Sequence, residues 1–178
     1  MNEPRPTAAD IERAIRTIPD FPKPGIQFKD ITPVLADARL FAASIDLLTS
    51  NFKPGTVDAV IGIDARGFIF AAAAALKLQT GLVPIRKKGK LPYKTREQDY
   101  ELEYGTATIA IHVDALKPGS RVLLIDDLLA TGGTSAAAAA LAESLGAKIL
   151  EVSFLIELGF LNGRAKLKNY PVRSLVVY

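Results

Sequence analysis

The chain contains no cysteine and only one histidine, His112. Without cysteine it can form no disulfide, no thiolate nucleophile and no cysteine-bearing zinc site. A single histidine cannot build a two-histidine metal site within one chain. We interpret His112 as a residue on the surface of a strand rather than as a catalyst.

Long apolar runs and a strong charge imbalance are also missing. The longest apolar stretch, residues 68–76, is too short to span a bilayer. The polar opening, residues 1–5, is unlike a secretory signal. The net charge of +3 is too slight to predict nucleic-acid binding without a concentrated basic patch. We therefore expect a cytoplasmic protein that binds neither a membrane nor a nucleic acid.

A length of 178 residues, of which 49% are hydrophobic and 23% charged, predicts one compact domain. Strands are predicted for residues 57–63, 81–85, 106–111, 121–125, 149–156 and 173–177. Helices are predicted for residues 7–18, 37–52, 67–78 and 134–145, with a weaker pattern over 161–167. Alternating strands and helices predict an α/β fold with a doubly wound, mainly parallel sheet.

Two segments interrupt this alternation. Residues 19–33 are rich in proline and show no clear period, so we expect an irregular arm that completes an N-terminal segment of residues 1–33. Residues 87–104 form a long polar stretch between two strands. A long insert of this kind in a compact domain is usually a lid, a binding loop or a disordered link. We expect a flexible loop there, and no domain boundary elsewhere.

Residues 122–134 carry the main chemical signal. A buried strand is followed by the adjacent carboxylates of Asp126 and Asp127, then by a loop of small residues and the start of a helix. Ligands of open α/β sheets bind beyond the carboxyl ends of the strands. Gly132 and Gly133 allow a close approach of the backbone, and the N–H groups of a helix start favour an anion. This loop is therefore predicted to hold a phosphate, to which the hydroxyls of Thr131 and Thr134 add donors.

Two carboxylates beside a phosphate loop repel a phosphate unless something offsets their charge. A sugar phosphate resolves this conflict, because its hydroxyls can donate to Asp126 and Asp127 while a magnesium ion balances the charge. The alternative is a helix-capping loop with solvated acids, and the loop alone does not decide between the two. Rival nucleotide motifs are absent, since the chain contains no G-x-x-x-x-G-K-[ST], no G-x-G-x-x-G after a strand and no G-x-S-x-G.

The run of residues 122–134 resembles the phosphoribosyl pyrophosphate signature of type I phosphoribosyltransferases, and of the adenine phosphoribosyltransferases in particular. Further segments match that family in its order along the chain, namely residues 21–31, 62–68, 85–92 and 102–105. The resemblance covers nearly the whole sequence. It implies the type I phosphoribosyltransferase fold, with a small N-terminal hood and a flexible catalytic loop at residues 87–104.

The resemblance also implies a reaction: adenine and phosphoribosyl pyrophosphate give AMP and pyrophosphate. Magnesium is expected to be held mainly by substrate oxygens and water rather than by protein ligands, and the protein is expected to be a homodimer. One alternative is a transferase for guanine, xanthine or orotate. Another is a regulator that senses phosphoribosyl pyrophosphate without transferring it, but the single helix before Pro19 is too little for a helix-turn-helix.

Roles for single residues follow from the same resemblance. The 5-phosphate is expected at Ala130, Thr131, Gly132, Gly133 and Thr134, and the ribose 2- and 3-hydroxyls at Asp126 and Asp127. Pyrophosphate is expected at Ala65, Arg66, Arg86 and Lys90, beside a cis peptide between Asp64 and Ala65. The base is expected at Gln27, Phe28, Lys29, Arg66 and Leu128, stacked between Phe28 and Leu128.

Some of these positions have a plain structural alternative. The basic run 86–90 is also typical of a solvated turn, although its place after a strand favours a ligand, and Phe28 alone would suit a core. Gln27 stands where the family is usually apolar, and Lys29 where arginine is common. Glu103 is implied as the general acid–base on a loop that closes over the substrates. By residue type alone, it is indistinguishable from the nearby acids at 97, 99 and 101.

Overall fold

The computed structural model describes residues 4–101 and 105–178. They fall into two compact units, which meet in sequence between Leu47 and Leu48. The first unit extends past the predicted arm of residues 1–33 and takes in two further helices. Within the described part of the chain, no helix is both long enough and apolar enough to cross a membrane.

The first unit begins with a capped helix and a two-stranded hairpin. Its elements are α1 (Ala8–Ala14), β1 (Arg16–Pro19), β2 (Gln27–Asp30), α2 (Thr32–Ala36) and α3 (Ala38–Leu48). The predicted start of α1 is confirmed, because Thr7 and Asp10 form a capping box. The predicted helix 7–18 is too long, since Ile15 is already extended and β1 pairs antiparallel with β2. The predicted irregular arm 19–33 therefore contains a strand.

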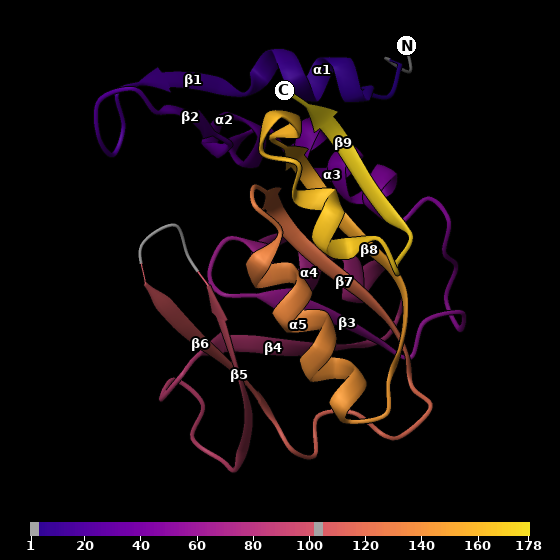
Figure 1. Cartoon of the computed structure of the whole chain (residues 1–178). Helices are drawn as coiled ribbons and strands as arrows, with labels where there is room; N and C mark the ends of the chain where they lie inside the picture. The colour runs from indigo at the N-terminus through magenta and orange to yellow at the C-terminus, as the bar shows by residue number, and fades with distance from the viewer. Residues whose placement is uncertain (1–3, 102–104) are drawn as a thin grey trace. The chain divides into compact units, whose positions relative to one another are not determined.

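The second unit is built on one seven-stranded sheet with the strand order β5-β6-β4-β3-β7-β8-β9. Its elements are β3 (Ala59–Ile63), α4 (Gly67–Lys77), β4 (Gly81–Lys87), β5 (Thr95–Glu101), β6 (Thr106–His112), β7 (Arg121–Leu129), α5 (Gly133–Ser144), β8 (Lys148–Glu157), the 3-10 helices η1 (Gly159–Leu161) and η2 (Gly163–Leu167), and β9 (Val172–Val177). The five strands from β4 to β9 in this order are parallel. β6 pairs antiparallel with β4, and β5 pairs antiparallel with β6. The predicted doubly wound, mainly parallel sheet is confirmed (Figure 1).

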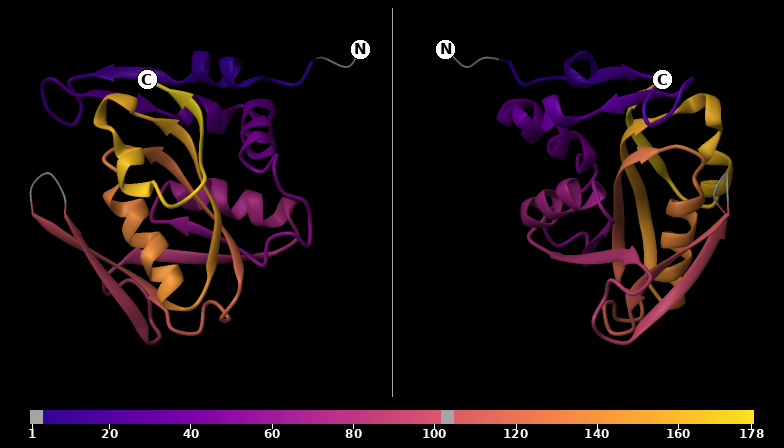
Figure 2. Two further views of the ribbon diagram at one scale, coloured as in Figure 1. Left: turned by 45° about the vertical axis from the view of Figure 1, so that its right-hand side comes forward. Right: turned by 90° about the vertical axis from the view of Figure 1, so that its left-hand side faces the viewer.

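The order of the strands reverses between β3 and β7. From β3 the chain passes through α4 to β4 on one side, and from β7 it passes through α5 to β8 on the other. With right-handed crossovers, these two steps put the helices on opposite faces of the sheet, and Figure 2 shows α4 and α5 in that arrangement. The crevice beyond the carboxyl ends of β3 and β7 is therefore the expected place for a ligand.

Small residues let α4 lie close to β3. A Cβ on Gly62 would be only 2.7 Å from the Cβ of Ala71. Ala71 and Ala74 are fully buried, as is the apolar run Val122–Ile125 of β7. The successive apolar positions of β7 are thus covered on both faces, as the sequence predicts for a central parallel strand.

Two predicted boundaries near the site need correction. The predicted polar loop 87–104 contains the strand β5, which pairs with β6 from Thr95 opposite His112 to Glu101 opposite Thr106. The predicted strand 121–125 continues as β7 to Leu129, because pairing with β8 persists as far as Leu129 opposite Glu157. The weak pattern over 161–167 is 3-10 rather than α-helical.

Candidate active site

The two adjacent aspartates lie within the last part of β7 rather than after it. Pairing with β3 stops at Gly62 opposite Ile125, whereas pairing with β8 continues to the end of β7. From Asp126 onward, one side of β7 is therefore free of a neighbouring strand. That side is where the turn from β3 into α4 follows.

This turn supplies direct partners for both carboxylates. Arg66 Nε lies 2.7 Å from Asp127 Oδ2, and only 9% of the Asp127 side chain is exposed. Gly67 lies against Asp126, since a Cβ at position 67 would be 2.5 Å from Asp126 Oδ1. The Asp127 N–H donates to that same oxygen at 2.9 Å. The structure thus brings Asp126, Asp127 and Arg66 together at the switch between β3 and β7.

Burial raises the pKa of both aspartates. Burial, with the neighbouring Asp127 carboxylate as the second cause, raises the pKa of Asp126 well above its ordinary value. Burial also raises the pKa of Asp127, and the Arg66 guanidinium offsets part of that increase. These acids are not the solvated carboxylates of a capping loop. They are poised to accept hydrogen bonds from neutral donors such as hydroxyl groups.

The predicted phosphate loop joins β7 to α5. Gly132 is the N-cap of α5, with φ of 76° in the left-handed region that favours glycine. Having no side chain, it cannot cap the helix, and the first intrahelical bond runs from Ala136 N to Gly132 O at 3.0 Å. The N–H groups before Ala136 have no acceptor within the helix and can receive an anion. This geometry favours phosphate binding over the capping alternative.

Two other elements, β5 and η2, approach Gly133 at the start of α5. A Cβ on Gly133 would lie 3.2 Å from the Glu101 carbonyl oxygen, 3.6 Å from the Tyr100 ring and 3.7 Å from Lys166 Nζ. The end of β5 therefore touches the phosphate loop. Lys166, which no sequence motif marks, brings a positive charge to the same place.

The predicted pyrophosphate residues lie in the turn after β3 and at the end of β4 or just after it. The Asp64–Ala65 peptide is cis, as the resemblance implies. Arg86 Nε lies 3.0 Å from Asp64 Oδ2, and Arg86 Nη1 donates to the Lys90 carbonyl at 3.0 Å. Asp64 thus holds the Arg86 guanidinium in place, a role that no sequence motif indicates. In the same basic run Lys88 is bound to Glu97 at 2.7 Å, as expected of a residue in a solvated turn.

The predicted base-binding residues are divided between the two units. Gln27, Phe28 and Lys29 lie on β2 of the first unit, where the Phe28 ring meets that of Phe21 edge-on at 5.1 Å between centroids. Lys29 Nζ donates to Thr17 Oγ1 at 2.9 Å. Leu128 lies half-buried near the end of β7 in the second unit. Glu103, the predicted general acid–base, lies outside the described residues.

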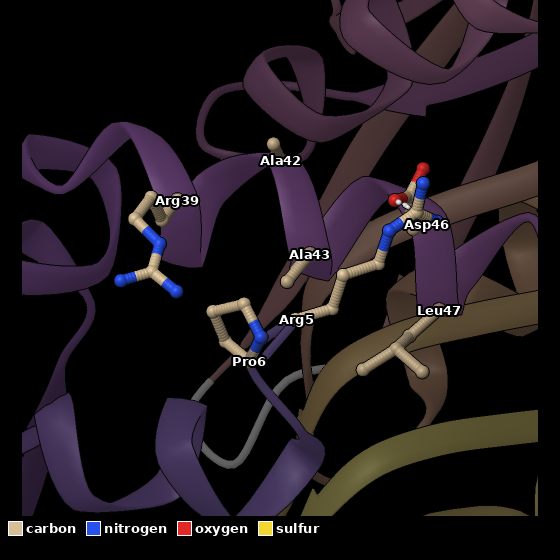
Figure 3. Close-up of a pocket in the computed structure, with 7 residues that line it drawn as sticks. All are labelled: Arg5, Pro6, Arg39, Ala42, Ala43, Asp46 and Leu47. Carbon is tan, nitrogen blue, oxygen red and sulfur yellow. Dashed lines mark ion pairs between the residues drawn. The ribbon is translucent and has the colours of Figure 1, made fainter. Parts of the chain in front are cut away.

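A pocket in the first unit contains none of the predicted site residues. It has a volume of about 450 Å³ and is lined by Arg5, Pro6, Arg39, Ala42, Ala43, Asp46 and Leu47. Figure 3 shows Arg5 reaching Asp46, an ion pair of 3.5 Å. His112, for which no role in the site is predicted, lies half-buried at the end of β6 with its ring edge-on to that of Tyr93.

A metal ion has few protein ligands available in the described residues. They contain no group of three or more histidine, cysteine, aspartate or glutamate side chains able to hold one. At the end of β7 there are two carboxylates, one of which is already paired with Arg66. Such a set fits an ion that takes most of its ligands from a substrate and from water, as magnesium commonly does.

Comparisons with known proteins give the family of the chain. Residues 27–175 match the phosphoribosyl transferase domain. The adenine phosphoribosyltransferase of Acidothermus cellulolyticus is 60% identical over 162 residues, which cover 91% of this chain and 92% of that protein. The chain belongs to the adenine phosphoribosyltransferase family.

Solved structures of adenine phosphoribosyltransferases share the fold. The enzyme of Saccharomyces cerevisiae, complexed with D-2,5-dideoxy-2,5-imino-altritol 1,6-bisphosphate and adenine, is 42% identical with a TM-score of 0.89, covering 94% of this chain and 97% of that one. The enzyme of Trypanosoma brucei, in complex with AMP, pyrophosphate and ribose-5-phosphate, is 25% identical with a TM-score of 0.87. The match covers 95% of this chain and 78% of the latter.

Proposed function

We propose that the chain transfers the phosphoribosyl group of phosphoribosyl pyrophosphate to adenine in purine salvage, giving AMP and pyrophosphate. The observation that carries this proposal is the pairing of two poorly hydrated carboxylates with an uncapped helix start, in a chain 60% identical to an adenine phosphoribosyltransferase. A phosphate and neighbouring hydroxyl groups satisfy both features at once.

The carboxylates at the end of β7 are assigned to the ribose. Hydroxyls at its 2- and 3-positions can donate to Asp126 and Asp127, while the first amides of α5 hold the 5-phosphate. As pyrophosphate leaves, positive charge develops at C1 of the ribose. Fixed carboxylates near the sugar stabilise that charge more than they stabilise the ground state.

The turn after β3 is assigned to the leaving pyrophosphate. Ala65 and Arg66 supply backbone donors there, and Arg86 and Lys90 supply positive charge. The pairing of Arg66 with Asp127 supports this assignment, because the cation lies beside the ribose carboxylates. Magnesium, held by substrate oxygens and water, adds neutralisation of the pyrophosphate charge when it is bound.

The base half of the reaction is assigned from the family resemblance. Phe28 and Leu128 offer an aromatic and an aliphatic surface to adenine, with Gln27 and Lys29 contributing through the neighbouring backbone and side chain. Glu103 is the general acid–base. A carboxylate within reach of N7 can manage the proton that the purine loses when N9 attacks C1.

We further propose a cytoplasmic homodimer. Ile18 and Phe21 of the β1–β2 hairpin segment are exposed large apolar side chains, at 37% and 51%, and support an interface there. Light scattering coupled to size-exclusion chromatography tests the dimer, which requires twice the chain mass of 19.1 kDa. Cell fractionation tests the compartment.

The activity itself is tested by mixing the protein with adenine, phosphoribosyl pyrophosphate and magnesium and following AMP by chromatography. We expect AMP and pyrophosphate in equal amounts, and none without phosphoribosyl pyrophosphate. The Asp127→Ala variant should stay folded by circular dichroism and lose transfer. Wild-type turnover in that variant would remove Asp127 from ribose binding, and no AMP from the wild type would overturn the proposed function.

A further inference from the structure

The phosphate loop rests on a second backbone segment, residues 158–167, which follows β8 and is called here the rear segment. A Cβ on Gly163 would collide with the carbonyl oxygen of Ala130, and a Cβ on Gly132 would collide with that of Gly163. The two stretches therefore meet backbone to backbone, more closely than side chains allow. Where the rear segment begins, Leu158 N donates to Leu129 O at 2.9 Å.

One guanidinium fixes the rear segment next to this contact. Arg164 follows Gly163 directly, and its Nε and Nη2 each lie 2.8 Å from a carboxylate oxygen of Glu157, at the end of β8. Glu157 is only 5% exposed. Hydrogen bonds from Arg164 lower the pKa of Glu157, so the pair is ionic. A two-pronged contact of this kind sets direction as well as distance.

The same guanidinium also reaches β9. Arg164 Nη1 donates to the Val172 carbonyl at 3.1 Å, and Nη2 to Ser174 Oγ at 3.2 Å. Gly159 N donates to Tyr178 O at 2.9 Å, which ties the start of the rear segment to the end of the chain. The backbone at Gly163 is thus fixed through Arg164 by β8 and β9, and not by the phosphate loop that it supports.

We infer that the rear segment is the back wall of the 5-phosphate site, and that Gly163 and Arg164 are positioning residues for phosphate binding. This inference rests on the proposed function. The N-cap Gly132 has no side chain to cap the helix. The orientation of the first backbone N–H groups of α5 therefore depends on the backbone packed behind them. Lys166 extends from the same segment to within reach of Gly133, so the back wall also carries a cation.

Loss of this support should weaken the binding of the phosphate group and leave the binding of the base unchanged. In the Arg164→Ala variant we expect the KM for phosphoribosyl pyrophosphate and the Kd for ribose 5-phosphate to rise about tenfold, because misaligned amides lose hydrogen-bond energy. The KM for adenine should stay within about twofold. Arg164→Lys keeps the charge but loses the planar fork, so its effect should be intermediate.

The chain offers a matched control in Arg173. Its Nε lies 2.9 Å from Oε1 of Glu151, a buried glutamate of the same strand β8, and its Nη1 donates to Ser50 Oγ at 3.0 Å. Arg173→Ala removes a comparable ion pair without touching the phosphate loop. We expect it to lower the melting temperature by about as much as Arg164→Ala while leaving ribose 5-phosphate affinity within about twofold of wild type.

The deciding experiment is calorimetric titration of ribose 5-phosphate into the wild type, Arg164→Ala, Arg164→Lys and Arg173→Ala, with melting curves for each. Weakened binding in the Arg164 variants alone supports the back wall. Equal binding in all four proteins, or equal weakening in the Arg164 and Arg173 variants, overturns it. If Arg164→Ala does not fold, Arg164→Lys against Arg173→Ala decides in the same way. A wild type that binds ribose 5-phosphate but makes no AMP contradicts the proposed function without deciding this inference.

Discussion

At the scale of single residues, the paired acids of β7 show how a site residue can cost stability. Both carboxylates have a raised pKa because burial leaves them poorly hydrated. The protonated carboxyls suit this buried place, so their contribution to stability is fully present below the ordinary carboxyl pKa of 3.8. It is lost as the pH rises through the higher pKa of the folded state. Ionisation of this pair is therefore unfavourable for folding, although the proposed reaction uses the carboxylates.

The Asp126→Asn variant separates these two effects. The amide can still accept from the Asp127 N–H but cannot ionise, so we expect a higher melting temperature at pH 7.5 and an advantage that shrinks as the pH falls toward 4. Transfer should drop by roughly ten- to a hundredfold, because a hydrogen bond to a charged group contributes about 1.5–3 kcal/mol. Melting curves from pH 4 to pH 8 and initial rates measure both. A variant less stable than wild type at pH 7.5 would contradict the charge account.

Glu103 carries the acid–base assignment. Glu103→Gln should lower kcat by about a hundredfold or more, with little change in the KM for phosphoribosyl pyrophosphate, because general acid–base catalysis contributes 10²–10⁴-fold. Glu101→Gln is the matched control, since Glu101 is an exposed acid at the end of β5. Steady-state rates compare the two. An equal loss in both variants would move the role to another group.

At the residue scale, a site can be predicted from the sequence where its chemistry is local in the chain. The run of residues 126–134 joins its acids, glycines and helix start within one stretch, so its pattern is visible without a structure. The ion pair of Arg66 with Asp127 and the contact of Gly163 with the phosphate loop join residues far apart in the chain. No local pattern marks them, so neither can be predicted from the sequence alone.

At the scale of elements, the sequence predicted buried strands and missed exposed ones. β3 is buried throughout and β7 nearly so, and their apolar runs predict them. β5 has the polar sequence TREQDYE and lies at the edge of the sheet, so no apolar alternation marks it. β1 is likewise exposed along its length and ends in proline. The extension of β7 was missed because aspartate is uncommon in strands.

One exposed ion pair links the segment before β3 to the start of β7. Arg121 lowers the pKa of Asp58 to about 2. This contribution to stability is present above the ordinary value of 3.8 and is lost as the pH falls through about 2. Asp58→Asn should therefore melt slightly below wild type at pH 7, with the gap closing between pH 4 and pH 2. The decrease is small because both side chains are 43% exposed.

The control for that variant is Asp114→Asn, on the exposed turn after β6. It should leave the melting temperature unchanged across the same pH range. A gap between Asp58→Asn and wild type that stays constant down to pH 2 would mean that packing, and not the charge of Asp58, holds these strands together.

At the scale of the whole molecule, the chemistry follows the fold. The doubly wound sheet reverses between β3 and β7. The ribose, phosphate and pyrophosphate assignments fall at the carboxyl ends of β3, β4 and β7 and on the segments that follow them. The base assignments on β2 come from a different unit and rest on the family resemblance. The phosphoribosyl half of the proposed reaction is therefore supported both by the geometry of the site and by the related proteins. The base half is supported by the related proteins alone.

The most direct test of this account is a base panel. With phosphoribosyl pyrophosphate and magnesium in excess, pyrophosphate release is measured for adenine, hypoxanthine, guanine, xanthine and orotate, and kcat/KM is compared. We expect adenine to exceed every other base by about a hundredfold or more, since a site that hydrogen-bonds one base leaves its polar groups unpaired with another. A higher kcat/KM for any other base, or no release with any of the five, would contradict the account.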